Sequence, residues 1–158
     1  MSILLIVLIS YKTKINLMLV KDVMNKNVVV AKSDVTIKEA SKVMAEYKIG
    51  SLVVLKDSEI KGIITDTDIV RALAKDMDID ATTMEDIMSK KVFTVDPEQT
   101  IEEAVDLMVK HKIKRLPVVE EGKIKGIVTA TDIAVVEPKL IASIASLISL
   151  RLPGLSGG

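Results

Sequence analysis

The sequence contains no cysteine and very few aromatic side chains. Without cysteine the chain can form no disulfide and offers no thiolate nucleophile or thiolate metal ligand, which fits a reducing cytoplasm. Aromatic residues make up only 2% of the chain, so base stacking on a single-stranded nucleic acid is not expected. Hydrophobic residues nevertheless account for 49% of the sequence. We therefore predict a cytoplasmic protein with an aliphatic core.

An excess of charge of either sign is also missing, because 22 basic residues balance 22 acidic ones. No overall field favours a nucleic acid or an anionic membrane. The single histidine, His111, has no partner at metal-ligand spacing and is interpreted as a half-exposed helix residue. No serine, cysteine or lysine lies in a nucleophile motif. We predict neither a metal site nor a catalytic cofactor.

Long apolar runs are absent as well. The N-terminal extension, residues 1–18, carries the seven-residue apolar run Ile3–Ile9, whereas a membrane-spanning helix needs about 20 apolar residues. The run lacks the basic flank and the cleavage site of a signal peptide. It either packs on the rest of the protein or on a partner, or lies upstream of a natural start at Met18.

What the sequence does contain is a repeat. With a constant offset of 64 positions, residues 22–70 align without gaps on residues 86–134, and 21 of the 49 positions are identical. A unit of about 50 residues buries too little surface to be stable alone. We therefore expect the copies, residues 19–75 and 84–137, to share a core and to face each other about a pseudo-twofold axis.

Each copy has the pattern strand, helix, strand, strand, helix, which is an α+β unit. Both first helices begin with a capping box, Thr36 to Glu39 and Thr100 to Glu103. On the first of these helices Ile37, Ala40, Met44 and Tyr47 are predicted to share the buried face. The predicted strands are 28–30, 52–55 and 60–64 in copy one and 92–95, 116–119 and 124–128 in copy two, with second helices from Thr65 or Asp66 and from Ala130.

Two segments lie outside the repeat. The linker, residues 76–83, contains an aspartate at every second position from 76 to 80, but Ala81 and Ile87 replace the glycine and glutamate of a calcium-binding loop. The C-terminal segment, residues 138–158, contains the apolar stretch Leu140–Leu150 and then a loose tail. We predict a helix there, with Ile141, Ile144 and Ile148 on one side, docked on the core or on a second subunit.

The repeated motif Gly-x-x-Thr-x-x-Asp has a purely structural interpretation. Thr65 with Asp68, and Thr129 with Asp132, have the spacing of capping boxes. A threonine that caps a helix and an aspartate that complements its dipole require no ligand.

The same atoms suit a ligand. A carboxylate at a strand-to-helix junction can accept both hydroxyls of a ribose, and a helix start offers backbone N–H groups to phosphate. The apolar side chains that could enclose a purine are Ile49, Ile63, Ile113 and Ile127. An enzyme is the least favoured class, because the paired carboxylates Asp66 and Asp68 become Ala130 and Asp132 in copy two.

The segments G-I-I-T-D-T-D and G-I-V-T-A-T-D, each preceded by an alanine-containing helix and a strand of the form I-x-x-L-x-V, resemble the cystathionine-β-synthase (CBS) domain. Two in tandem resemble a CBS pair. The resemblance implies that Thr65, Asp68, Thr129 and Asp132 bind ribose, that Thr67, Thr131 and Arg115 meet phosphate, and that Gly50 joins the base-binding wall. Ser51 stands in copy one where copy two has Arg115.

This resemblance implies a non-catalytic sensor of adenosine-containing ligands such as AMP, ADP, ATP or S-adenosylmethionine. The ligand would bind in clefts between the repeats, and the output would pass to a separate protein or through a change of oligomer. A homodimer is expected. The alternative is a ligand-free interaction module in which both Thr-x-x-Asp elements only cap helices.

Overall fold

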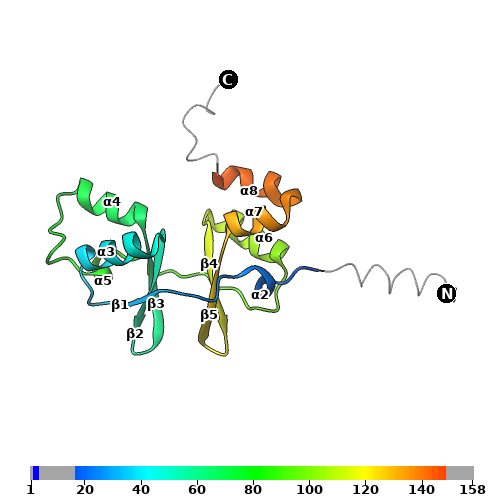
Figure 1. Ribbon diagram of the computed structural model, residues 1–158, viewed down its shortest axis with the longest axis horizontal. Helices are drawn as coiled ribbons and strands as arrows, with labels where there is room; N and C mark the ends of the chain where they lie inside the picture. Colours follow the sequence, from blue (N-terminus) through cyan, green and yellow to red (C-terminus); the bar gives the residue numbers. More distant parts are fainter. Residues whose placement is uncertain (1, 4–16, 149–158) are drawn as a thin grey trace, which may run out of the picture. The chain divides into compact units, whose positions relative to one another are not determined.

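The computed structural model describes residues 2–3 and 17–148, except for the side chains of residues 146 and 148. The chain divides into two compact units. Unit 1 combines residues 1–26, 95–120 and 125–158, and unit 2 combines residues 27–94 and 121–124. Helices and strands are mixed in both, so the predicted α+β class is confirmed (Figure 1). Most of Ile3–Ile9 and all of the predicted loose tail lie outside the described residues.

Unit 2 is built on a three-stranded sheet. Strand β2 (Ser51–Lys56) lies in the centre, parallel to β1 (Val30–Lys32) and antiparallel to β3 (Glu59–Thr65). The helices are α3 (Ile37–Tyr47), α4 (Asp66–Ala74) and the short α5 (Met84–Ile87). The predicted hairpin and both long helices are confirmed, whereas β1 begins two residues later than predicted.

Local sequence explains the start of α3 and its buried face. Thr36 Oγ1 accepts a hydrogen bond from the Glu39 N–H at 3.3 Å, and Glu39 Oε2 accepts one from the Thr36 N–H at 3.0 Å. The predicted capping box is therefore confirmed. Ala40 and Met44 belong to the core cluster of unit 2, but Tyr47 is 60% exposed. Its predicted burial is wrong, because the helix ends there and Lys48 turns the chain away with φ of 52°.

Unit 1 contains the corresponding elements of copy two. Strands β4 (Arg115–Glu120) and β5 (Lys123–Thr129) form a two-stranded sheet. The helices of this unit are α2 (Val20–Val23), α6 (Ile101–His111), α7 (Ala130–Val136), the 3-10 turn η1 (Pro138–Leu140) and α8 (Ile141–Ile148).

The strand predicted at residues 92–95 does not form. Only Val95 pairs with β4: its N–H donates to Pro117 O at 3.1 Å, and its O accepts from the Val119 N–H at 2.9 Å. Pro97 and Pro117 have no N–H, so the ladder cannot continue in either direction. Copy one has Ser33 and Val53 at these positions, and there the parallel pairing of β1 with β2 is complete.

The short helices that open the copies are exchanged between the units. Helix α2 is the first element of copy one but lies in unit 1, where the Val20 N–H donates to Gln99 O at 2.8 Å. Helix α5 is the first element of copy two but lies in unit 2, where the Met84 N–H donates to Val35 O at 2.9 Å. Each compact unit therefore combines residues from both sequence copies.

The C-terminal helix α8 packs within unit 1 against α6 and α7 (Figure 1). Ile144 is buried as predicted, and Leu147 is buried beside it. Ile141 is 45% exposed, so its predicted place on the buried side is wrong; the buried residues follow an i, i+3 spacing that begins one turn later. No helix within residues 17–148 is long and apolar enough to cross a membrane.

Candidate ligand site at the strand-to-helix junctions

The glycine of each repeated motif lies against a crossing chain. A Cβ on Gly62 would lie 2.7 Å from Met88 Cγ and 3.0 Å from Ser89 O. A Cβ on Gly126 would lie 2.9 Å from Asn25 O and 2.7 Å from Met24 Sδ. The missing side chain of each glycine therefore permits a close approach of the segment that follows α5 or α2.

In unit 2 the capping box at the start of α4 is complete. Asp68 Oδ2 accepts hydrogen bonds from the Thr65 N–H at 2.8 Å and from Thr65 Oγ1 at 2.9 Å. Thr65 Oγ1 in turn accepts from the Asp68 N–H at 3.3 Å. Thr65 and Asp68 therefore make the helix-capping hydrogen bonds that the structural interpretation of the motif predicts.

The second oxygen of this carboxylate has a different environment. Asp68 Oδ1 lies 3.8 Å from Arg71 Nη1, a residue three positions along α4. An ionised carboxylate has about four acceptor positions, so the box leaves Asp68 with acceptor capacity. Arg71 is not among the site residues predicted from the sequence, although the i, i+3 spacing from Asp68 is one at which helical side chains meet. The equivalent residue of copy two is Val135.

The start of β2 lies beside this junction. Ser51 pairs with Thr65 across the sheet, and Gly50 O accepts a hydrogen bond from the Asp66 N–H at 3.1 Å. The side chains of Ile49 and Ile63 are half-buried. Gly50 is thus brought directly to the Thr65–Asp68 element, together with the first residue of β2.

Thr67 lies in the first turn of α4, but its backbone donor is engaged. The Thr67 N–H donates to Asp66 Oδ1 at 2.8 Å. A phosphate at Thr67 would have to displace this carboxylate and meet its charge. Copy two has Ala130 in place of Asp66, so Thr131 at the start of α7 faces no such competitor at that position.

Unit 1 repeats the junction. The Thr129 N–H donates to Asp132 Oδ2 at 3.2 Å, and the Asp132 N–H donates to Thr129 Oγ1 at 3.1 Å. Lys114 O accepts a hydrogen bond from the Ala130 N–H at 2.8 Å. Because Arg115 follows Lys114 directly, the strand that carries this half-buried arginine meets the start of α7.

Three other residues of unit 1 that were predicted to contact the ligand differ in solvent exposure. Ile113 and Ile127 are half-buried, and Thr131 is exposed. The Ile127 backbone pairs with Asn25, at 2.8 and 3.0 Å for the two N–H···O bonds. Among the described residues, no group of three or more histidine, cysteine, aspartate or glutamate side chains is placed to hold a metal ion.

Comparisons with known proteins place this architecture in a family. The model of the CBS domain matches residues 20–75 and 84–138. The CBS domain-containing protein YhcV of Bacillus subtilis is 35% identical over 117 residues, which are 73% of this chain and 83% of that protein.

Solved structures are similar over most of the chain. The crystal structure of the CBS domain pair of protein MJ0100, in complex with 5′-methylthioadenosine and S-adenosyl-L-methionine, matches with a TM-score of 0.72 and 32% identity, over 78% of this chain and 98% of that one. A hexameric CBS-CP12 protein from bloom-forming cyanobacteria matches with a TM-score of 0.73 and 29% identity, over 81% and 76%. With both repeats matched by the family model, the chain belongs to the CBS domain family as a tandem pair.

Proposed function

We propose that this CBS pair is a non-catalytic sensor that binds an adenosine-containing ligand at its strand-to-helix junctions. The observation that carries the proposal is the Asp68 carboxylate. Its Oδ2 accepts hydrogen bonds from the Thr65 N–H and from Thr65 Oγ1, and its Oδ1 lies 3.8 Å from Arg71 Nη1. A ribose diol needs such a fixed, partly buried carboxylate as its acceptor.

The ribose-binding role is assigned to Thr65 with Asp68 and to Thr129 with Asp132. Arg115 is assigned to a phosphate or another anionic group, since a guanidinium recognises phosphate through several donors. Thr67 and Thr131 are assigned to the same group, and the base would contact Ile49, Gly50, Ile63, Ile113 and Ile127. AMP, ADP, ATP, S-adenosylmethionine and 5′-methylthioadenosine are the candidate ligands, the last two because the MJ0100 pair holds them.

The sensor acts by population shift. A ligand changes the output only if it binds one arrangement of the protein more tightly than another. We propose that the output passes to a separate protein or through a change of oligomer, and that the chain forms a homodimer.

A second candidate function is favoured by one observation. Thr83 and Asp86 at the start of α5 form a box with the same distances as Thr65 and Asp68, 2.8 Å from the N–H and 2.9 Å from Oγ1. That box follows no glycine-containing strand. A Thr-x-x-Asp box can therefore form for capping alone, as an interaction module without a ligand requires.

Thermal unfolding separates the two functions. The purified protein is heated with adenosine, AMP, ADP, ATP, S-adenosylmethionine or 5′-methylthioadenosine at about millimolar concentration. A ligand at 100 times its Kd stabilises the fold by about 2.7 kcal/mol, which is a shift of several degrees. Asp68→Ala or Asp132→Ala should remove the shift. Asp86→Ala is the matched control, because it removes an equivalent box elsewhere and should leave the shift intact.

If no compound shifts the midpoint, the sensor function is wrong and the interaction module stands. If Asp86→Ala removes the shift as fully as Asp68→Ala and Asp132→Ala, loss of a cap rather than loss of a ligand contact explains the effect. The ribose assignment would then be wrong.

A further inference from the structure

Methionine carries all of the sulfur in this chain. The sequence has no cysteine and eight methionines. Among the described residues three methionines are buried: Met44, Met84 and Met108. The others that the structure describes are only half-buried: Met18, Met24, Met77 and Met88. A peroxide oxidises a thioether only where it reaches the sulfur, so these four side chains are the ones that an oxidant in solution meets in the folded protein.

Two of the four are equivalent in the repeat and make the same contact. Met88 lies 64 positions after Met24. Met24 Sδ lies 2.7 Å from the point that a Cβ on Gly126 would occupy, and Met88 Sδ fills the same space at Gly62. Neither of the other two half-buried methionines has a methionine 64 positions later. Met24 and Met88 therefore each pack on the glycine of a Gly-x-x-Thr-x-x-Asp motif.

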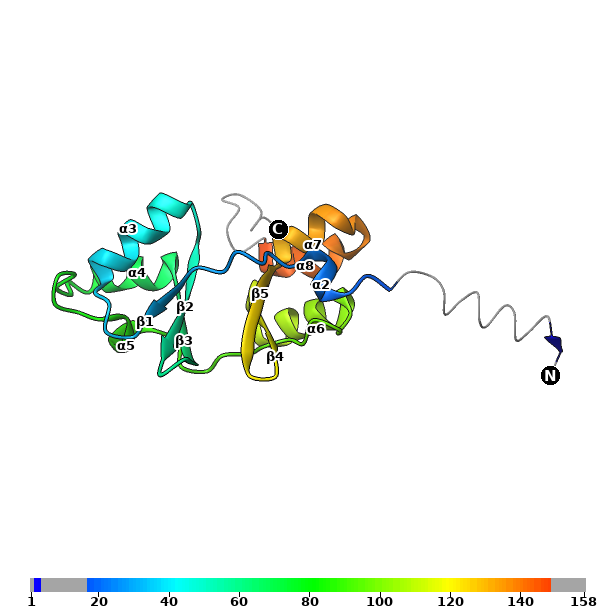
Figure 2. The ribbon, with the colours of Figure 1, turned by 60° about the horizontal axis from the view of Figure 1, so that its bottom comes forward.

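The residue after each of these methionines is bridged to a hairpin strand. In unit 2 the Ile63 N–H donates to Ser89 O at 3.1 Å, and the Ser89 N–H donates to Ile63 O at 3.0 Å. In unit 1 the Ile127 and Asn25 backbones make the same two bonds, at 3.0 and 2.8 Å, where the segment that follows α2 passes beside β5 (Figure 2). Both are isolated bridges, so each segment also depends on the packing of its methionine.

Oxidation would change this packing. A sulfoxide converts the flexible apolar side chain into a polar one. Its oxygen cannot point toward the glycine, because even the Cβ of an alanine would be too close there. A sulfoxide oxygen buried without a donor is unfavourable, so the side chain would turn toward solvent and leave the glycine uncovered. The neighbouring bridge would then open more often.

We propose that Met24 and Met88 are sites of reversible oxidation, and that their sulfoxides loosen the Asn25–Ile127 and Ser89–Ile63 bridges. The oxidant is a hydroperoxide. With hydrogen peroxide, a sulfur lone pair attacks one oxygen, the S–O bond forms and the O–O bond breaks. The departing hydroxide takes the proton of the sulfur-bound hydroxyl and leaves as water, so the sulfur is oxidised by two electrons and the peroxide is reduced.

The modification is reversible by known chemistry. A methionine sulfoxide reductase returns the thioether, releases the oxygen as water and oxidises a dithiol to a disulfide. The proposal goes beyond ligand sensing, because it concerns a covalent change of this chain that requires no ligand.

Hydrogen peroxide treatment of the full-length protein tests the proposal. Peptide mass spectrometry follows each methionine: Met24 and Met88 should gain one oxygen while the three buried methionines stay reduced. After removal of the peroxide, NMR measures amide exchange of the Ile63 and Ile127 N–H groups. Both rates should rise at least about tenfold, because the loss of a packed methionine contact outweighs the free energy that a factor of ten requires. The reductase with dithiothreitol should restore slow exchange.

Leucine variants locate the effect. Leucine fills a similar volume and has no sulfur to oxidise. After peroxide treatment Met88→Leu should keep slow exchange at Ile63 but not at Ile127, and Met24→Leu should do the opposite. Met77→Leu is the matched control, since Met77 is half-buried but is not among the nearest atoms to either motif glycine. Both responses should remain in that variant.

An effect on ligand binding rests on the proposed function, because Ile63 and Ile127 are assigned there to the base. If AMP stabilises the untreated protein, oxidation should weaken its binding, and the double variant Met24→Leu/Met88→Leu should bind AMP equally before and after treatment. If AMP does not bind, the ligand assignment fails, whereas the exchange rates still decide whether the two methionines are oxidation sites.

Three results would overturn the proposal. The first is that Met24 and Met88 stay reduced while Met18 and Met77 are oxidised. The second is that amide exchange of Ile63 and Ile127 does not change after both are oxidised. The third is that exchange still accelerates in the leucine variants, since another residue would then be responsible.

Discussion

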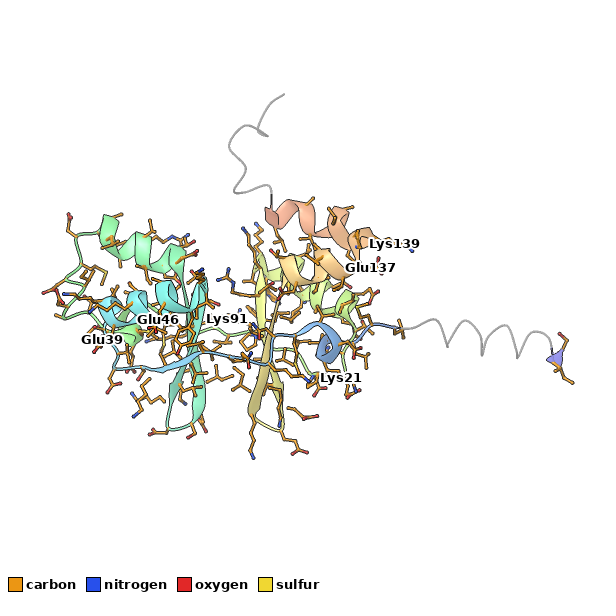
Figure 3. All side chains as sticks on the ribbon, in the orientation of Figure 1. Lys21, Glu39, Glu46, Lys91, Glu137 and Lys139 are labelled. Atoms are coloured by element: carbon orange, nitrogen blue, oxygen red, sulfur yellow. The ribbon has the colours of Figure 1, made fainter. Side chains whose placement is uncertain are left out.

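Lys21 Nζ lies 2.6 Å from Glu98 Oε1, although the two residues are 77 positions apart in sequence. Lys21 is on α2 (Figure 3), the short helix at the start of copy one that lies in unit 1. At the equivalent position of α5 stands Glu85, which lies 3.1 Å from Lys56 in unit 2. The charges of the two ion pairs are transposed: a lysine of α2 meets a glutamate of unit 1, and a glutamate of α5 meets a lysine of β2. Each of the two exchanged helices therefore forms an ion pair with the unit in which it lies.

Reversing one charge tests this matching. Lys21→Glu would face Glu98 and Glu120, whose carboxylates both favour the charged lysine and raise its pKa in the wild type, Glu98 more strongly. We expect a small fall in the unfolding temperature at low salt, which 1 M salt abolishes. Adding Glu98→Lys should restore part of it. Lys61→Glu, which breaks a pair within one strand, is the comparison; an equal salt-sensitive loss from both variants would contradict the matching.

Acid should destabilise the fold below about pH 4.5. The Thr36 N–H lowers the pKa of Glu39 from 4.5, and the Thr83 N–H lowers the pKa of Asp86 from 3.8. The hydrogen bond from Lys56 lowers the pKa of Glu85 from 4.5. A depressed folded pKa contributes stability that is present above the unfolded value and is lost as pH falls through the folded one.

The contribution of these three carboxylates to the unfolding temperature should therefore stay constant between pH 7 and about pH 5 and decline as the pH falls further. Differential scanning calorimetry from pH 7 to pH 2 measures it. A midpoint that is constant down to pH 3 would show that these carboxylates contribute nothing.

The motif glycines should not tolerate alanine. In Gly126→Ala the new methyl group would press on the side chain of Met24 and on the carbonyl of Asn25, and that carbonyl accepts a hydrogen bond from the Ile127 N–H. Overpacking of this kind costs about 1–3 kcal/mol. In Gly62→Ala the nearest obstacle is the side chain of Met88, so adding Met88→Ala should recover part of the loss. Urea unfolding measures both; unchanged stability in Gly126→Ala would refute the close-packing role.

The two hairpin turns carry different residues at the same left-handed backbone position, so each residue can be substituted by the other. Ser58 has φ of 64°, and its counterpart in copy two is Gly122 with φ of 74°. A side chain in the left-handed region costs about 1–2 kcal/mol. Ser58→Gly should therefore raise stability by up to about 1 kcal/mol, and Gly122→Ser should lower it by about as much. A loss of stability in Ser58→Gly would count against the strained-turn explanation.

How much of this could be predicted from sequence depends on the range of the interaction. Capping boxes at Thr36 and Thr65 were readable, because every atom they use lies within four positions. The interrupted strand at Val95 was not, although both prolines were visible, because their effect depends on the register with β4. Helices α2 and α5 span four residues each, which is too few for a periodic hydrophobic pattern. Their exchange between the units depends on contacts between residues that are far apart in sequence.

The candidate site divides in the same way. The Thr65–Asp68 element and its copy were found from the repeat. Arg71 beside Asp68, and the Asp66 carboxylate that holds the Thr67 N–H, depend on side-chain directions that only the structure gives. Both modify what a ligand would meet in copy one, and neither has a counterpart in copy two, where Val135 and Ala130 stand.

The most direct test of ligand sensing is a calorimetric titration of the wild type and three aspartate-to-asparagine variants with the compound that stabilises the protein best. Asparagine keeps the shape and removes the charge, so the folds remain comparable. The wild type and Asp86→Asn should bind with the same Kd, whereas Asp68→Asn or Asp132→Asn should weaken binding at least about tenfold, the loss expected when a charged hydrogen-bond partner is removed. Equal affinity in all four proteins, or no heat of binding in the wild type, would show that these aspartates only cap helices.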